Sequence, residues 1–281
     1  GYSSNGAIRN LGKQTTLSGA ITLGGAAIIT SFGSNTVSSS DSLIITGGVT
    51  LGSNTLTLDV SRGMRIGDQS VAGSKITGAG AILKSGGTDT LVMNSANDYS
   101  GATTINNGVI VLKTATGLGS GLNGTTDHTS IASLAAVRLD ISGATIPEYF
   151  SLNGTGISTT GAIRVPSTSA GNTLSGTITI ATTGSRINSD ATLLTLSNAT
   201  SIATGSNLSI AIGGLGEVSI SGALTGSGTI TRDGTGTGSI LTLTGNSSSF
   251  TGPIIMSTNS NLLKVSNANA LGTTGTLTLN T

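Results

Sequence analysis

The strongest concentration of charge in the sequence lies between residues 59 and 68. In this short stretch the carboxylates of Asp59 and Asp68 flank the guanidinium groups of Arg62 and Arg65. On a scaffold of stacked strands, such a set could cleave an acidic polysaccharide, because a basic residue removes a proton beside a carboxylate-bound metal. The same residues could instead form a surface ion-pair network that anchors an irregular loop and adds little stability. We favour the loop, because no second acidic cluster accompanies the four residues.

The single histidine is the next candidate. His128 follows Asp127, and the two could serve as an acid–base pair, although a lone histidine in a Thr- and Ser-rich loop is more often simply exposed. The spacings of a Ser-His-Asp triad, a zinc site and a phosphate-binding loop are absent, and the glycine-rich tract 213–216 reads as turns. We therefore assign no catalytic, cofactor-binding or metal-binding residue, and the sequence predicts a protein without enzymatic activity.

Pairs of threonine separated by one residue form a further pattern. A flat ladder of such pairs on a solenoid could bind ice, but their spacing here is irregular. Threonine also favours the extended backbone, so outward-facing strand positions explain the pairs more simply. The pairs are Thr55 with Thr57, Thr177 with Thr179, Thr229 with Thr231, Thr242 with Thr244, and Thr276 with Thr278.

The composition limits the class of protein. The 281 residues carry a net charge of +1, with 8% charged residues, 2% aromatic residues, 44 Gly and no Cys. Such a balance predicts no binding of nucleic acid and no attraction to an anionic membrane. No apolar run approaches the roughly 18–20 residues that span a bilayer. The absence of cysteine suits an extracellular protein that relies on repetition, and we expect an exported chain whose leader lies outside this sequence.

The stretch 78–112 shows how the chain is built. The apolar and β-branched residues fall at 81–84, 91–93 and 109–112, which predicts three short strands. The residues between them, Gly86-Gly87, Asn97-Asp98 and Asn106-Asn107-Gly108, favour turns. No period of 3.6 residues persists in the chain, so helices are not expected.

This stretch recurs at 226–265. Gly78 matches Gly226 and Tyr99 matches Phe250, so the second copy has three extra residues between these two points. The matched aromatic positions favour packing at a corner against the next coil. A repeated unit of strands and turns without a helix predicts a solenoid.

A second pair of segments divides the chain into related halves. Residues 6–9 recur at 161–164, and residues 17–22 recur at 174–179. Arg9 and Arg164 are matched by this repeat, which suggests a shared structural role for them. We predict one continuous solenoid with halves 1–150 and 151–281, interrupted by irregular loops at 61–77 and 121–150. If Thr281 were joined to Gly1, the resulting sequence would be similar to that of residues 152–164, which is the pattern expected of a tandem array.

The unit 78–120 resembles the autotransporter-associated β-strand repeat of bacterial surface proteins. The matching residues are Gly78, Gly80, Leu83, Lys84, Gly86, Leu91, Tyr99, Gly101, Thr104, Ile105 and Gly108. In the second copy they are Gly226, Gly228, Ile230, Leu241, Leu243, Phe250, Gly252 and Ala270-Leu271-Gly272, with Arg232 in place of the lysine and Pro253 after the turn glycine. The resemblance implies a right-handed parallel β-helix built from short coils, displayed on a Gram-negative cell surface. It carries no catalytic residues.

The sequence therefore predicts an all-β, parallel β-helix that serves as a structural segment of a cell-surface or extracellular fibre. Stacked Asn or Thr in successive coils could satisfy buried backbone groups. Expected partners are neighbouring modules or other copies of the chain, stacked end to end through unpaired strands. Two alternatives remain open: an adhesin that binds glycan or protein through its loops, and a polysaccharide-degrading enzyme on the same scaffold.

Overall fold

The computed structural model describes residues 6–32, 43–120, 127–258, 260–273 and 275–280. Within these ranges the regular elements are short β-strands and one 3-10 turn, η1 (Ile157–Thr159). Residue contacts divide the chain into two compact units, 1–137 and 138–281, and β16 (Ala135–Leu139) contains the boundary. The predicted halves at residue 150 and their continuity stay predictions.

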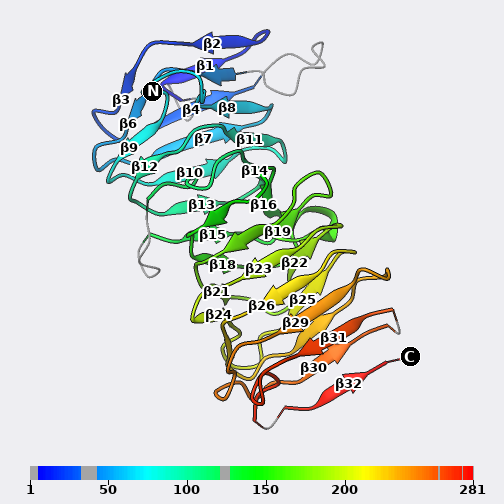
Figure 1. The fold of residues 1–281 in the computed structure, drawn as a ribbon. Helices are drawn as coiled ribbons and strands as arrows, with labels where there is room; N and C mark the ends of the chain where they lie inside the picture. Colours follow the sequence, from blue (N-terminus) through cyan, green and yellow to red (C-terminus); the bar gives the residue numbers. More distant parts are fainter. Residues whose placement is uncertain (1–5, 33–42, 121–126, 259, 274, 281) are drawn as a thin grey trace. The chain divides into compact units, whose positions relative to one another are not determined.

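The first unit is a parallel β-solenoid, in which successive coils add one strand to each of three sheets (Figure 1). The first sheet contains β1 (Ile8–Asn10), β4 (Ala27–Ser31), β7 (Leu56–Val60), β10 (Ile82–Ser85), β13 (Thr103–Ile105) and β15 (Thr129–Ile131). The second contains β2 (Thr15–Leu17), β5 (Leu43–Ile45), β8 (Met64–Ile66), β11 (Thr90–Met93) and β14 (Gly108–Leu112). The third contains β3 (Ile21–Thr22), β6 (Val49–Thr50), β9 (Ile76–Gly78) and β12 (Asp98–Tyr99).

The second unit has the same three-sheet construction. One sheet contains β18 (Phe150–Leu152), β21 (Ile178–Ile180), β24 (Thr200–Ala203) and β27 (Ala223–Thr225). Another contains β19 (Ile163–Val165), β22 (Ser185–Ser189), β25 (Ile210–Gly213), β28 (Ile230–Arg232), β30 (Ile254–Met256) and β32 (Leu277–Leu279). The last contains β17 (Thr145–Ile146), β20 (Asn172–Leu174), β23 (Leu194–Leu196), β26 (Val218–Ile220), β29 (Ile240–Leu243) and β31 (Leu262–Val265).

The core of each unit consists of columns of aliphatic side chains. On β7, Leu56, Leu58 and Val60 are fully buried, whereas Thr57 and Asp59 point outward. This alternation follows from the period of two in a strand. Because stacked coils repeat the same inward positions, the core is built from narrow columns of aliphatic side chains and not from a large cluster of aromatic ones. The predicted β-helix class is confirmed.

The coils differ in length. Ile212 lies opposite Arg232 in the next coil, whereas Ala27 lies opposite Leu56, so the coil that begins at Ala27 is much the longer of the two. The expectation of an irregular loop over 61–77 is wrong, because β8 and the start of β9 lie in this stretch. Charge at the outward position between two inward apolar residues does not end a strand. In the other expected loop, residues 121–126 lie outside the described part, and β15 to β18 begin in the rest.

The internal repeat has a structural counterpart in each unit. Tyr99 pairs with Gly78 in the first unit, and Phe250 forms a parallel bridge with Gly226 in the second. The strand β10 pairs with β13 as β28 pairs with β30. The second pairing closes a longer coil, which agrees with the insertion read from the sequence. The matched segments therefore build matched coils.

Candidate functional site

The charged residues at 59–68 are distributed over two strands and a loop. Asp59 lies on β7 and Arg65 on β8, which belong to different sheets. Asp59 Oδ1 accepts a hydrogen bond from Ser61 Oγ at 3.3 Å, and Asp68 Oδ1 accepts from Ser70 Oγ and N at 2.6 and 2.9 Å. The Ser70 hydroxyl is the main cause of the lowered pKa of Asp68. Both carboxylates thus take part in local turns through serine residues, and the ion-pair network with Arg62 and Arg65 stays a prediction.

The histidine lies partly buried at the edge of β15. Its Nδ1 has no hydrogen-bond partner among the described residues, so His128 makes no pair with Asp127 through that atom. The backbone carbonyl of His128 accepts the Thr103 amide at 3.4 Å, as a coil-to-coil contact. The possible acid–base role of His128 and Asp127 stays a prediction.

Two of the threonine pairs do not continue into the adjacent coil as a threonine ladder. Thr57 lies opposite Leu83, and Thr231 lies opposite Ile255. An aliphatic residue in the adjacent coil interrupts the row in both places. These threonines occupy outward strand positions, as predicted.

Two further features of the described residues bear on function. No group of three or more His, Cys, Asp or Glu in this part of the chain is arranged to hold a metal ion. No helix among the same residues is long and apolar enough to cross a membrane.

One lysine in the first unit is buried, and the sequence did not lead us to predict this. Lys84 is fully buried and stands in register between Leu58 and Ile105, within an aliphatic column. Its Nζ donates to the Asn107 carbonyl at 2.6 Å, in the turn of the following coil. Burial lowers the pKa of Lys84 to about 8, against the opposing influence of nearby carboxylates, of which Asp89 is the strongest.

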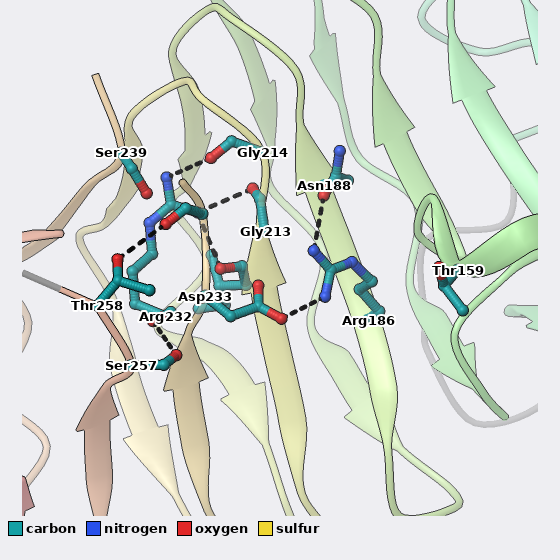
Figure 2. A network of polar contacts seen from close by, with 12 residues as sticks. Thr159, Arg186, Asn188, Gly213, Gly214, Arg232, Asp233, Ser239, Ser257 and Thr258 are labelled. Atoms are coloured by element: carbon teal, nitrogen blue, oxygen red, sulfur yellow. Dashed lines mark hydrogen bonds and ion pairs between the residues drawn. The ribbon is translucent and has the colours of Figure 1, made fainter. Parts of the chain in front are cut away.

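The equivalent position in the second unit holds a buried arginine. Arg232 is fully buried and continues a column from Ile212 on β25. Its Nη1 donates to the carbonyls of Ile212 and Gly213 at 2.9 and 2.8 Å. Its Nη2 donates to those of Gly214 and Gly216 at 3.0 and 2.6 Å (Figure 2). Burial lowers the pKa of Arg232 to about 10. The guanidinium thus binds the turn of the preceding coil to β28.

Sequence reasoning missed these two cations because charge is normally placed outside. The spacing contained a usable signal. Ile82 and Lys84, like Ile230 and Arg232, are two residues apart and must face the same side of a strand. A basic residue at the same place in both copies was therefore a candidate for an inward role.

The matched aromatic residues pack at corners, which confirms that prediction. Tyr99 and Phe250 are both fully buried. The phenol oxygen of Tyr99 is 2.6 Å from Thr103 Oγ1. In each copy a glycine with positive φ covers the ring, because a Cβ on Gly119 would lie 3.2 Å from the Tyr99 ring and one on Gly272 3.1 Å from the Phe250 ring. Only a residue without a side chain fits there.

Buried asparagine side chains connect successive coils, as the sequence predicts. Asn97 Oδ1 accepts the Ile76 amide at 2.8 Å, and its Nδ2 donates to the Gly117 carbonyl at 2.7 Å. One side chain thus satisfies backbone groups of the coils on both sides. Asn172 makes both of its contacts with the preceding coil, since it accepts the Ala144 amide and donates to the Ile141 carbonyl.

A chain of outward polar contacts crosses the second unit. Arg164 Nε donates to Asp190 Oδ2 at 2.8 Å, and Asn188 Nδ2 donates to Asp190 Oδ1 at 2.6 Å. Arg186 Nη2 donates to Asn188 Oδ1 at 3.3 Å, and its Nη1 donates to Asp233 Oδ2 at 2.5 Å. Figure 2 shows the Arg186 guanidinium between Asn188 and Asp233.

The expected common role of Arg9 and Arg164 is wrong. The Arg9 guanidinium stacks over the Phe32 ring at 5.4 Å from its centroid. Arg164 instead pairs with Asp190. The repeated sequence therefore places the two arginines against different partners.

No family model, no curated protein and no solved structure matches this chain. The functional argument therefore depends on the fold and on the contacts described above.

Proposed function

We propose that this chain is a non-enzymatic structural β-solenoid segment of a bacterial cell-surface or extracellular fibre or adhesin stalk. In this role, coils of neighbouring modules or of a second copy stack on its ends. The observation that carries the proposal is the way in which each coil covers the inward aliphatic column positions of the coil before it.

These column positions change from buried to exposed within one coil. Leu277 lies opposite Ile254, and Leu279 lies opposite Met256. Ile254 and Met256 are 1% and 2% exposed, whereas Leu277 and Leu279 are 41% and 65% exposed. A further coil with aliphatic residues in the same register would cover both leucines, and burying each one contributes about 1.5–3 kcal/mol.

The first unit has a complementary apolar feature at its first coils. A cavity of about 360 Å³ opens there, between the first three coils. Its lining includes the aliphatic side chains of Ile8, Ile21, Leu23, Ile29 and Leu56. Leu23, Ile29 and Leu56 are at most 7% exposed, so this apolar cavity lies within the core and offers little to a charged ligand. In the proposed assembly, the last coil of one copy stacks on the first coil of the next.

The internal contacts fit a load-bearing role. Backbone ladders, asparagine bridges and the two buried cations each connect neighbouring coils, so the many hydrogen bonds between two coils share the load of a pull along the stack. The low charge and the Thr- and Ser-rich outer positions keep the outside neutral. The resemblance of the unit 78–120 to a surface-protein repeat supports an exported location.

End stacking is tested by sedimentation velocity over a range of protein concentrations. We expect the wild-type chain to form larger species as concentration rises, and electron microscopy should then show a regular axial repeat. The double variant Leu277→Lys/Leu279→Lys should remain monomeric, because two ammonium groups would face the docking coil. Leu193→Lys is the matched control, since Leu193 is 42% exposed outside these strands.

Two results would contradict the stacking proposal. One is a wild-type chain that stays monomeric at every concentration. The other is a double variant that associates as the wild type does.

A further inference from the structure

A polar trough crosses the outer surface of the second unit. It has a volume of about 480 Å³, within the range of small-molecule sites. Side chains from several coils line it, and the residues that carry the argument are Arg186, Asn188, Asp190, Leu215 and Asp233. The glycine-rich tract 213–216, which the sequence led us to interpret as turns, contributes Gly214 and Leu215 to the lining.

Small residues on β25 create the trough. Arg186 and Asn188 on β22 point outward, and their partners in register on β25 are Ala211 and Gly213. A Cβ on Gly213 would lie 1.9 Å from Arg186 Nη2 and 2.4 Å from Asn188 Oδ1. The absence of a side chain at this position lets the Arg186 guanidinium lie across β25 and reach Asp233 beyond β28. Residues 47 positions apart are joined in this way.

The polar groups in the trough are held in fixed positions. Asn188 is bonded to both Arg186 and Asp190, and Arg186 is bonded to Asp233. Two atoms of this network, Arg186 Nε and Asp233 Oδ1, are buried and have no hydrogen-bond partner among the described residues. A donor and an acceptor therefore remain unsatisfied beside a cavity, which is uncommon for buried polar groups.

The chemistry of the lining selects the ligand. Carboxylates accept hydrogen bonds from hydroxyl groups, while guanidinium and amide nitrogens donate to hydroxyl oxygens. The charges of Asp190 and Asp233 are balanced by their partners Arg164 and Arg186, so the site offers no net charge to an ionic ligand. Leu215, which is 49% exposed, adds an apolar surface at the edge. Alternating donors and acceptors beside an apolar patch match the hydroxyls and C–H faces of a sugar ring.

We propose that this trough is a binding site for a neutral saccharide. Binding of this kind goes beyond the structural role, because a stacked fibre would present one such trough on each copy.

The test uses the whole 281-residue chain, labelled with ¹⁵N, and nuclear magnetic resonance titration with neutral disaccharides (maltose, cellobiose and lactose) up to about 10 mM, where weak sites saturate. We expect at least one of them to shift the amide signals of Gly213, Gly214 and Leu215. The acidic sugars digalacturonate and 3′-sialyllactose, titrated in parallel, should shift them less.

Two variants and one control connect the binding to the trough. Asp233→Asn keeps the volume but removes the charge opposite Arg186, and it should weaken binding about tenfold. Leu215→Ser, at an exposed position that folding tolerates, should also weaken it. Asp140→Asn breaks another Arg–Asp contact, that with Arg138, away from the trough, and should bind as the wild type does.

Three results would overturn the proposal. The first is that no neutral disaccharide shifts the trough amides. The second is that only the acidic sugars do so. The third is that the folded variants Asp233→Asn and Leu215→Ser bind as tightly as the wild type. Self-association in sedimentation is measured separately, so failure here leaves the structural role unaffected.

Discussion

Replacement of Arg232 by methionine tests whether buried cations connect the coils. Methionine keeps much of the apolar stem but removes all four hydrogen bonds to the turn at 212–216. The Ile212 carbonyl also accepts the Asp233 amide, so at most three carbonyls lose their donor. Each buried acceptor without a donor costs about 1–3 kcal/mol. Relief from burying the charge offsets part of this cost, and removal of one partner from a buried charged contact typically costs about 3–5 kcal/mol.

We therefore expect Arg232→Met to lower the free energy of unfolding by about 3–5 kcal/mol. Arg232→Lys should fall between this variant and the wild type, because an ammonium group keeps the charge but lacks the planar fork that reaches several carbonyls. The assay is urea-induced unfolding followed by far-UV circular dichroism, with an unchanged slope required for the comparison.

Arg164→Met is the matched control for this experiment. The Arg164 side chain is 37% exposed and pairs with Asp190 at the surface, so its loss should cost less than about 1 kcal/mol. Equal effects of Arg232→Met and Arg164→Met would refute the reasoning, since the buried contacts would then add nothing beyond a surface pair.

Three further predictions concern the two units' cores and corners. Lys84 has a pKa of about 8 in the folded protein and an ordinary value of 10.5, so the folded protein loses this proton first as pH rises. The free energy of unfolding should therefore increase between about pH 8 and 10.5. Lys84→Met should lack this increase in urea titrations at each pH, and an identical pH profile of the two proteins would contradict the burial of a charged amine. Gly119→Ala should cost about 3 kcal/mol, since its φ is +95° and its Cβ would lie 2.3 Å from the Tyr99 carbonyl oxygen. Gly143→Ala, at a φ of +66° and with open space around its Cβ, should cost about 1 kcal/mol. Equal thermal shifts would rule out the crowding at Gly119. Asn97→Ala should cost about 2–4 kcal/mol and speed hydrogen exchange of the amide that it caps, and unchanged exchange there would show that the bridge is dispensable.

The period of two and the turn residues were sufficient to predict the class of fold. Leu56, Leu58 and Val60 alternate with polar residues, so the sequence alone places them on one face of a strand. Positive-φ glycines such as Gly86 and Gly108 lie at strand ends, where turns were predicted. The copies at 78–112 and 226–265 also predicted the matching corners of Tyr99 and Phe250, because similar patterns of apolar and turn residues place strands and turns at matching positions.

Other features depend on which residues the stacking brings together. Nothing near Arg186 in the sequence identifies Asp233 as its partner, and the contact exists because two coil lengths bring the strands into register. The coil from Ile212 to Arg232 is much shorter than the one from Ala27 to Leu56, so a local pattern does not fix which residues lie side by side.

The sequence by itself determined the strands, the turns and the repeat, because backbone preference and side-chain alternation are local properties. Only the tertiary structure decided that Lys84 and Arg232 lie in the core and that polar side chains of separate coils form a trough. Burial of a charge is favourable only where carbonyl groups of a neighbouring coil are positioned to accept its hydrogen bonds. That positioning is set by the stacking of whole coils.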